Sequence, residues 1–271
     1  MASRILSTNF GNIAIEESAG RGTPLLFIHG NSSCKEIFKH QFAGAIGEKY
    51  HCIAMDLPGH GESDNAHDPE QTYTIPRYAD VAIAVMENLN LSSYAILGWS
   101  LGGHIGIEMM SRATDVKGLL ISGTPPVGSD PNDMSSAFRP TEHMAFTGQE
   151  ILSDEQAEQY AHATCGSGPR YECFLGDAVR RTDGRARRIM MEAAMRGEGV
   201  DQKNEVMDNE TPLAIINGAD EAMINNEYLT TIEYKNLWEE TVHLIENAGH
   251  APFLESPHDF DVLLDRFMRS L

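Results

Sequence analysis

Ser100 is the residue whose setting most clearly allows chemistry. It is the centre of Gly98-Trp99-Ser100-Leu101-Gly102, which follows a short apolar run and precedes a helix-like run of small residues. This strand–turn–helix context is that of a G-x-S-x-G nucleophile elbow, in which the glycines leave room for a tight turn. The start of the following helix and the Leu101 backbone N–H favour negative charge beside the serine. The pattern predicts that Ser100 attacks an ester-like carbonyl.

His250 is the candidate base for Ser100. It lies late in the chain, in a loop just after the strand-like residues 241–245. A histidine placed there can take the serine proton during attack and return it to the leaving group. Serine, acid and histidine follow one another in this order in α/β hydrolases. We therefore expect the acid between Ser100 and His250.

Two neighbouring carboxylates, Asp220 and Glu221, follow the strand-like residues 213–217 and could serve as that acid. The usual layout in α/β hydrolases places the acid three residues after a glycine, here Gly218, which favours Glu221. The acid holds the histidine ring in one tautomer and stabilises its charged form. Asp220 remains the alternative.

An oxyanion hole requires two backbone N–H groups that point at the reacting oxygen. Leu101, directly after the serine, offers the first. His29-Gly30-Asn31 follows an early apolar run, and we expect Asn31 to supply the second. His29 itself is interpreted as a structural hydrogen-bonding residue.

Strand-like and helix-like runs alternate along the chain, which predicts an α/β protein with a mostly parallel twisted sheet and helices on both faces. Helical spacing marks residues 75–88 and 105–112, and residues 4–8 are interpreted as one arm of an N-terminal hairpin. The candidate strands are residues 13–17, 25–29, 52–55, 95–98, 119–122, 213–217 and 241–245.

This alternation stops after Thr124-Pro125-Pro126. From there to about residue 209 the chain is polar, helix-prone and free of convincing strands. We interpret residues 125–209 as a helical cap inserted into an α/β-hydrolase core formed by residues 1–124 and 210–271. Such a cap would cover the carboxyl ends of the strands, where ligands bind in open α/β sheets.

Several longer strings together resemble the metal-independent N-acylhomoserine lactonases of the α/β-hydrolase fold. The resemblance spans nearly the whole chain, and its more specific strings lie in the cap. These strings are Gly30-Asn31-Ser32-Ser33, residues 98–109, Gly123-Thr124-Pro125-Pro126-Val127, Gly148-Gln149-Glu150-Ile151, residues 182–190 and Asn236-Leu237-Trp238-Glu239.

The resemblance implies hydrolysis of the homoserine lactone ring by Ser100, His250 and Glu221, through an acyl-enzyme. It also implies substrate contacts by Trp99, beside the nucleophile, and by Tyr160 in the cap, whose phenol would bond the lactone oxygen. Neither a cofactor nor a metal is expected. The sequence lacks an H-x-H-x-D-H cluster, a G-x-G-x-x-G loop and a Walker lysine.

The resemblance implies a small acyl lactone or ester as the partner, and the composition disfavours two other classes of partner. The formal net charge of −20 disfavours nucleic acid and anionic lipid, and no apolar run approaches the length of a membrane span. The four cysteines lack paired spacing and are expected to be reduced and mostly buried. Residues 1–5 lack the layout of a secretory signal, so we expect a cytoplasmic enzyme.

Two other functions are compatible with the same residues. A general carboxylesterase for small acyl esters would use the same catalytic groups. A lactone-binding receptor on the same fold would bind its ligand without rapid turnover. The substrates turned over, and the number of turnovers, separate these functions.

Overall fold

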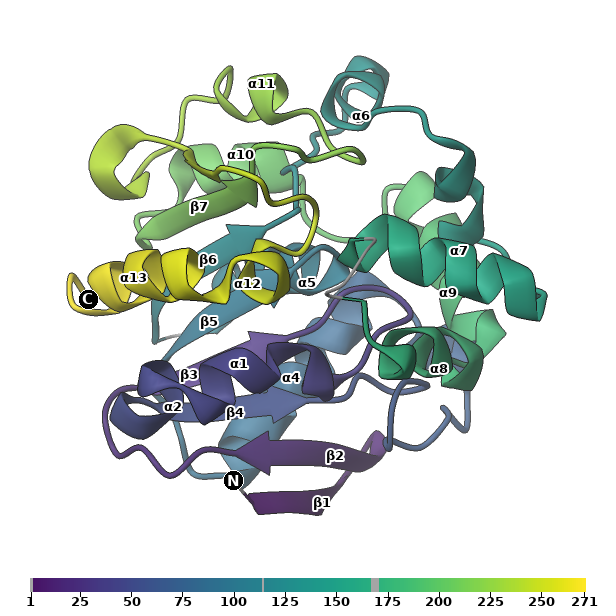
Figure 1. Ribbon diagram of the computed structural model, residues 1–271, viewed down its shortest axis with the longest axis horizontal. Helices are drawn as coiled ribbons and strands as arrows, with labels where there is room; N and C mark the ends of the chain where they lie inside the picture. The colour runs from purple at the N-terminus through teal and green to yellow at the C-terminus, as the bar shows by residue number, and fades with distance from the viewer. Residues whose placement is uncertain (1, 114, 167–170) are drawn as a thin grey trace.

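The computed structural model describes residues 2–113, 115–166 and 171–271 (Figure 1). Its centre is one eight-stranded sheet with the order β1-β2-β4-β3-β5-β6-β7-β8. Strands β1, β2 and β4 pair antiparallel, and all other neighbours pair parallel. The strands are β1 (Ala2–Thr8), β2 (Gly11–Glu17), β3 (Pro24–Ile28), β4 (His51–Met55), β5 (Tyr94–Trp99), β6 (Val116–Ser122), β7 (Leu213–Gly218) and β8 (His243–Ile245).

Every strand expected from the sequence is present, and the N-terminal hairpin is confirmed by the pairing of β1 with β2. The ends differ by up to three residues. β8 begins two residues later than expected. It follows the short 3-10 helix η3 (Trp238–Glu240), in which Glu239 and Glu240 adopt φ angles of 54° and 53°.

Alternate residues of the central strands face two separate apolar layers. Leu25 and Phe27 of β3 pack with Phe38 and Phe42, whereas Leu26 and Ile28 pack in the cluster that contains helices α4 and α5. This alternation follows from the period of two along a strand. Figure 1 shows α1, α2, α12 and α13 in front of the sheet and α4 and α5 behind it. The sheet is thus covered on both faces, as expected.

Helix α4 has the bounds expected from its apolar spacing, Ile75–Asn88, whereas α5 runs from Leu101 to Met110 and ends two residues earlier than expected. The other elements of these layers and their connections are η1 (Lys35–Phe38), α1 (Lys39–Ala43), α2 (Ala45–Lys49), α3 (Pro69–Thr72), α11 (Asn226–Leu229), α12 (Pro252–Glu255) and α13 (Pro257–Met268). Within the described residues, none of the helices is both long and apolar enough to span a membrane.

The chain between β6 and β7 is helical. Figure 1 places α6 to α9 on the side toward which the arrowheads of the parallel strands point, whereas α10 contacts α5. Ser153 and Gln156 start α7 with a reciprocal capping box. The elements are α6 (Pro131–Ala137), η2 (Glu142–Thr147), α7 (Asp154–Cys165), α8 (Cys173–Arg181), α9 (Gly184–Met195) and α10 (Gln202–Asp208).

The cysteines agree with the expectation of reduced, mostly buried thiols. All four are free. Cys34, Cys52 and Cys165 are buried, and Cys173 is exposed.

Candidate active site

The backbone of Ser100 is held in a strained turn between β5 and α5. Its φ of 52° and ψ of −117° lie outside the regions that side-chain-bearing residues favour. The Ser100 N–H donates to the Ser122 carbonyl at 2.8 Å, and the Thr124 hydroxyl donates to the Ser100 carbonyl at 2.8 Å. These bonds fix the turn so that the serine lies at the start of a helix.

The glycines of the elbow are required by close backbone approach. A Cβ atom on Gly98 would lie 2.3 Å from the Gly102 carbonyl oxygen, and one on Gly102 would lie 2.0 Å from that of Ile28. No side chain fits at either distance. The spacing G-x-S-x-G thus follows from the packing of α5 against β3 and β5.

His250 and Glu221 are brought together as expected. The His250 Nδ1 lies 2.7 Å from Glu221 Oε2, and both side chains are buried. An ionised carboxylate only accepts hydrogen bonds, so Nδ1 carries a proton, and in the neutral ring Nε2 keeps the lone pair. Ser100 and His250 line the same cavity. This tautomer is the one that a general base needs.

The geometry distinguishes Glu221 from Asp220 as the carboxylate that contacts His250. Besides its bond to His250, Glu221 accepts a bond from the Met223 N–H at 2.7 Å. Burial alone would raise the Glu221 pKa, but the charge of His250 and these hydrogen bonds lower it overall. Asp220 is exposed, and its backbone N–H donates to Ala248. The structure therefore pairs His250 with Glu221.

The lowered pKa of Glu221 predicts a loss of stability in acid. A carboxylate whose pKa is lower in the folded than in the unfolded chain stabilises the fold fully above its unfolded value, 4.5. That contribution is lost as the pH falls through the folded-state pKa. We expect the free energy of unfolding, measured by urea titration from pH 6 to pH 3, to fall more steeply for the wild type than for Glu221→Gln. Parallel pH profiles would contradict this expectation.

Trp99 has a positioning contact that the sequence did not indicate. Its indole Nε1–H donates to the His250 backbone carbonyl at 2.8 Å, and its ring packs edge-on against Phe253, 5.4 Å between centroids. The side chain is 1% exposed but lines the cavity. Its N–H is therefore already engaged by the histidine loop, and only the ring is offered to a ligand.

Gly123 is a further residue of the site that sequence reasoning missed. It adopts a φ of +63°, and a Cβ atom there would lie 2.7 Å from His250 Cε1. Its N–H donates to the Asn217 side chain at 2.9 Å. The glycine thus lets the histidine ring approach the end of β6. Its signal in the sequence is a glycine directly after a buried strand.

The two expected oxyanion donors lie on separate elements of one cavity wall. Leu101 is the first residue of α5, where backbone N–H groups lack a partner within the helix. Asn31 lies in the turn after β3, and its side-chain amide donates to the Thr147 carbonyl at 2.8 Å. The Asn31 turn is therefore tied to η2.

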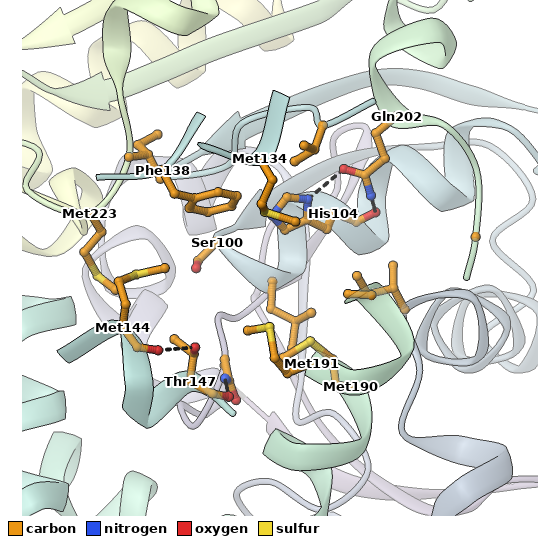
Figure 2. A pocket seen from close by; sticks show the side chains of 18 of the residues that line it. Ser100, His104, Met134, Phe138, Met144, Thr147, Met190, Met191, Gln202 and Met223 are labelled. Atoms are coloured by element: carbon orange, nitrogen blue, oxygen red, sulfur yellow. Dashed lines mark hydrogen bonds between the residues drawn. The ribbon is translucent and has the colours of Figure 1, made fainter. Parts of the chain in front are cut away.

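The cavity next to Ser100 measures about 540 Å³ and extends under the helices between β6 and β7, here called the helical segment. Methionine and aromatic side chains form part of its wall, and Figure 2 shows the methionines and Phe138 around Ser100. A methionine wall adapts to flexible apolar ligands. The side chains of this kind are Trp99, Met134, Phe138, Met144, Tyr160, Met190, Met191 and Met223.

Tyr160 extends from α7 to the wall of this cavity. It is 2% exposed, and its ring packs edge-on against Phe146 with 6.3 Å between centroids. Burial raises the pKa of Tyr160, although Arg187 and Asn31 oppose that rise. The phenol therefore stays protonated and can donate a hydrogen bond to a ligand.

Arg187 of α9 ties the helical segment to the turn after β3. Its guanidinium donates to the carbonyls of Gln149, Glu150 and Val179 at 2.8, 3.1 and 3.3 Å, and to the Ser32 hydroxyl at 3.2 Å. The side chain is buried, and burial lowers its pKa. The planar guanidinium suits several acceptors at once.

We expect Arg187→Met to lower the free energy of unfolding by about 2–4 kcal/mol, because it leaves buried acceptors unpaired. Arg188→Met, on the same helix, is the matched control. Arg188 is only partly exposed but pairs with the surface carboxylates Glu150 and Glu192, and such pairs contribute about 1 kcal/mol or less. Chemical denaturation of both variants checks the difference, and equal losses would contradict it.

In the three described stretches of chain, no group of three or more His, Cys, Asp or Glu residues is placed to hold a metal ion.

Comparison with known proteins identifies relatives that share this fold. The model of the Alpha/beta hydrolase family matches residues 25–261. The structure of N-acyl homoserine lactonase AidH in complex with N-butanoyl homoserine superposes with a TM-score of 0.96 at 46% identity, over 99% of this chain and 97% of that one. A complex of an AidH variant with N-hexanoyl homoserine lactone gives the same TM-score and identity.

Curated relatives are more distant. The AB hydrolase superfamily protein YisY of Bacillus subtilis is 33% identical over 107 residues, which is 39% of each chain. A pimeloyl-[acyl-carrier protein] methyl ester esterase of Aromatoleum aromaticum is 26% identical over 231 residues, or 79% of this chain and 85% of that one. The predicted α/β-hydrolase fold is confirmed by the family match and by the AidH structures.

Proposed function

This chain belongs to the α/β hydrolase family, and on that premise we propose that it opens the lactone ring of N-acylhomoserine lactones as a metal-independent serine hydrolase. The observation that carries the proposal is the methionine-lined cavity beside Ser100 and the His250–Glu221 pair, in a fold shared with AidH along nearly the whole chain. An apolar cavity suits an acyl chain. With the acyl chain in this cavity, the lactone carbonyl would lie beside Ser100.

The reaction begins when Ser100 Oγ attacks the lactone carbonyl carbon. His250 Nε2 takes the serine proton while Glu221 holds the ring and stabilises its positive charge. The carbonyl oxygen becomes negative and is held by the backbone N–H groups of Asn31 and Leu101. Losing one such donor typically costs about 3 kcal/mol of transition-state stabilisation.

The tetrahedral intermediate collapses by breaking the bond between the carbonyl carbon and the ring oxygen. His250 gives its proton to that oxygen, which becomes the homoserine hydroxyl. The Tyr160 phenol donates to the ring oxygen as negative charge develops there. A water molecule, deprotonated by His250, then attacks the acyl-enzyme, and N-acylhomoserine leaves.

We propose that residues 125–209 form the cap of this enzyme over a core of residues 1–124 and 210–271. The cap supplies Tyr160 and most of the methionine wall, so the length of the acyl chain is sensed there. A cytoplasmic location and a lack of binding to nucleic acid remain predictions from the sequence.

Mass spectrometry of N-hexanoyl homoserine lactone incubated with the enzyme tests this function. We expect a mass gain of one water that acidification reverses, because acid closes the ring again. Cleavage of simple esters with the lactone ring left closed would indicate a general carboxylesterase instead. One slow turnover with a lasting adduct would indicate a lactone receptor.

A further inference from the structure

His104 lies on α5 one helical turn after Ser100 and lines the same cavity. In the view of Figure 2 its ring lies between Ser100 and Gln202. The ring Nδ1 lies 2.7 Å from Gln202 Oε1. No step of the reaction above uses this histidine.

The protonation of the His104 ring is fixed by Gln202. The Gln202 Nε2 donates to the His104 backbone carbonyl at 3.3 Å. Because a carbonyl only accepts, the amide nitrogen must face it, and the amide oxygen must face the ring. The ring Nδ1 is therefore the donor. Burial lowers the pKa of His104 despite the bond to Gln202, so the ring is neutral and its Nε2 carries a lone pair.

Apolar side chains line the cavity together with His104. The Phe138 ring lies 6.5 Å from the His104 ring between centroids, and Met134 and Met190 line the same cavity. Among the residues that the structure describes, Nε2 has no hydrogen-bond partner. A lone acceptor on an apolar wall favours ligands that bring a donor and disfavours those that bring another acceptor.

We propose that His104 is a specificity-determining residue whose Nε2 accepts a hydrogen bond from a hydroxyl on the third carbon of the acyl chain. This inference rests on the proposed lactonase function. The third acyl carbon is five bonds from the attacked carbon, which is long enough to reach the next turn of α5, about 6 Å along the helix. The substrate amide N–H is only two bonds away and falls short of that turn.

The expected order of substrate preference follows from the lone pair on His104 Nε2. A 3-hydroxyacyl lactone donates to Nε2, an unsubstituted lactone makes no polar contact there, and a 3-oxoacyl lactone presents oxygen lone pairs to a nitrogen lone pair. At equal chain length we therefore expect kcat/KM to decrease in that order.

His104→Phe is the first test, with N-hexanoyl, N-(3-hydroxyhexanoyl) and N-(3-oxohexanoyl) homoserine lactone as substrates. Phenylalanine keeps a ring but removes the acceptor. The ratio of kcat/KM for the 3-hydroxy substrate to that for the unsubstituted one should fall about three- to ten-fold. The unsubstituted lactone serves as the internal control, because a general structural defect lowers all three values together.

Gln202→Glu is the second test, and we expect it to invert the preference between the 3-hydroxy and 3-oxo substrates. A carboxylate facing Nδ1 favours the charged imidazolium, so that Nε2 becomes a donor. The 3-oxo substrate should then be preferred over the 3-hydroxy substrate, whereas loss of packing alone does not invert a preference.

The outcomes separate the two proposals. Turnover of all three lactones with ratios that neither variant changes would overturn the role of His104 and leave the lactonase function intact. A wild type that opens none of the three lactones would overturn the lactonase function, and with it the role of His104.

Discussion

Ser100→Ala is expected to lower kcat for lactone opening by about 10⁵–10⁶-fold, because it removes the atom that forms the new bond. The remaining activity would come from direct attack by water on a lactone bound in the cavity, with the oxyanion donors stabilising the negative oxygen. Ring opening followed by liquid chromatography over hours gives enough range to measure such a loss. The turn is held by hydrogen bonds from the Ser100 backbone N–H to Ser122 and from the Thr124 hydroxyl to the Ser100 backbone carbonyl, so the variant should fold.

His250→Ala and the double variant Ser100→Ala/His250→Ala extend this prediction. Because the two side chains act as one unit, the double variant should be about as slow as either single variant. Multiplied losses would show that they act independently, which contradicts a shared proton transfer. Thermal unfolding of each variant checks that the fold is intact.

Glu221→Gln is expected to lower kcat by about 10⁴-fold, close to the effect of replacing the acid of such a triad by its amide. The amide can donate to Nδ1, so it permits the tautomer in which Nε2 carries the proton and cannot act as a base. It also removes the negative charge that stabilises the imidazolium. Glutamine keeps the shape of the buried side chain, so the loss reports chemistry rather than packing.

Asp220→Asn is the matched control for Glu221→Gln. Asp220 precedes Glu221 directly but is exposed, and its structural contact runs through its backbone N–H. We expect kcat within about two-fold of the wild type, as for surface substitutions that remove no buried contact. A large loss with Asp220→Asn and a small one with Glu221→Gln would reverse the assignment of the acid.

Much of the fold could be predicted because its local patterns agree with its packing. The strands are short apolar runs between turn residues, and α4 carries its spacing along its full length. The ends were less predictable. The start of β6 contains Lys117 and Gly118, which hide it in the sequence, although Val116 and Gly118 pair with Tyr94 and Ala95 of β5 across a register shift at Lys117.

The candidate site was predictable where a residue type and its neighbours are distinctive, as for Ser100 in its glycine elbow. Contacts between distant segments were not. The bond from Trp99 to the His250 carbonyl joins positions 151 residues apart, and the bond between His104 and Gln202 spans 98. Neither leaves a local signal, because each depends on how the helical segment and the late loops fold back onto α5.

The most direct measurement of the central claim is the mass of the protein during turnover of N-hexanoyl homoserine lactone, after rapid acid quenching. Opening a lactone leaves both halves of the substrate attached, so the acyl-enzyme should be heavier by the mass of the complete lactone. Peptide mapping should place that mass on Ser100, and Ser100→Ala should show neither adduct nor product. Ring opening by Ser100→Ala at the wild-type rate, or an adduct on another residue, would contradict the account.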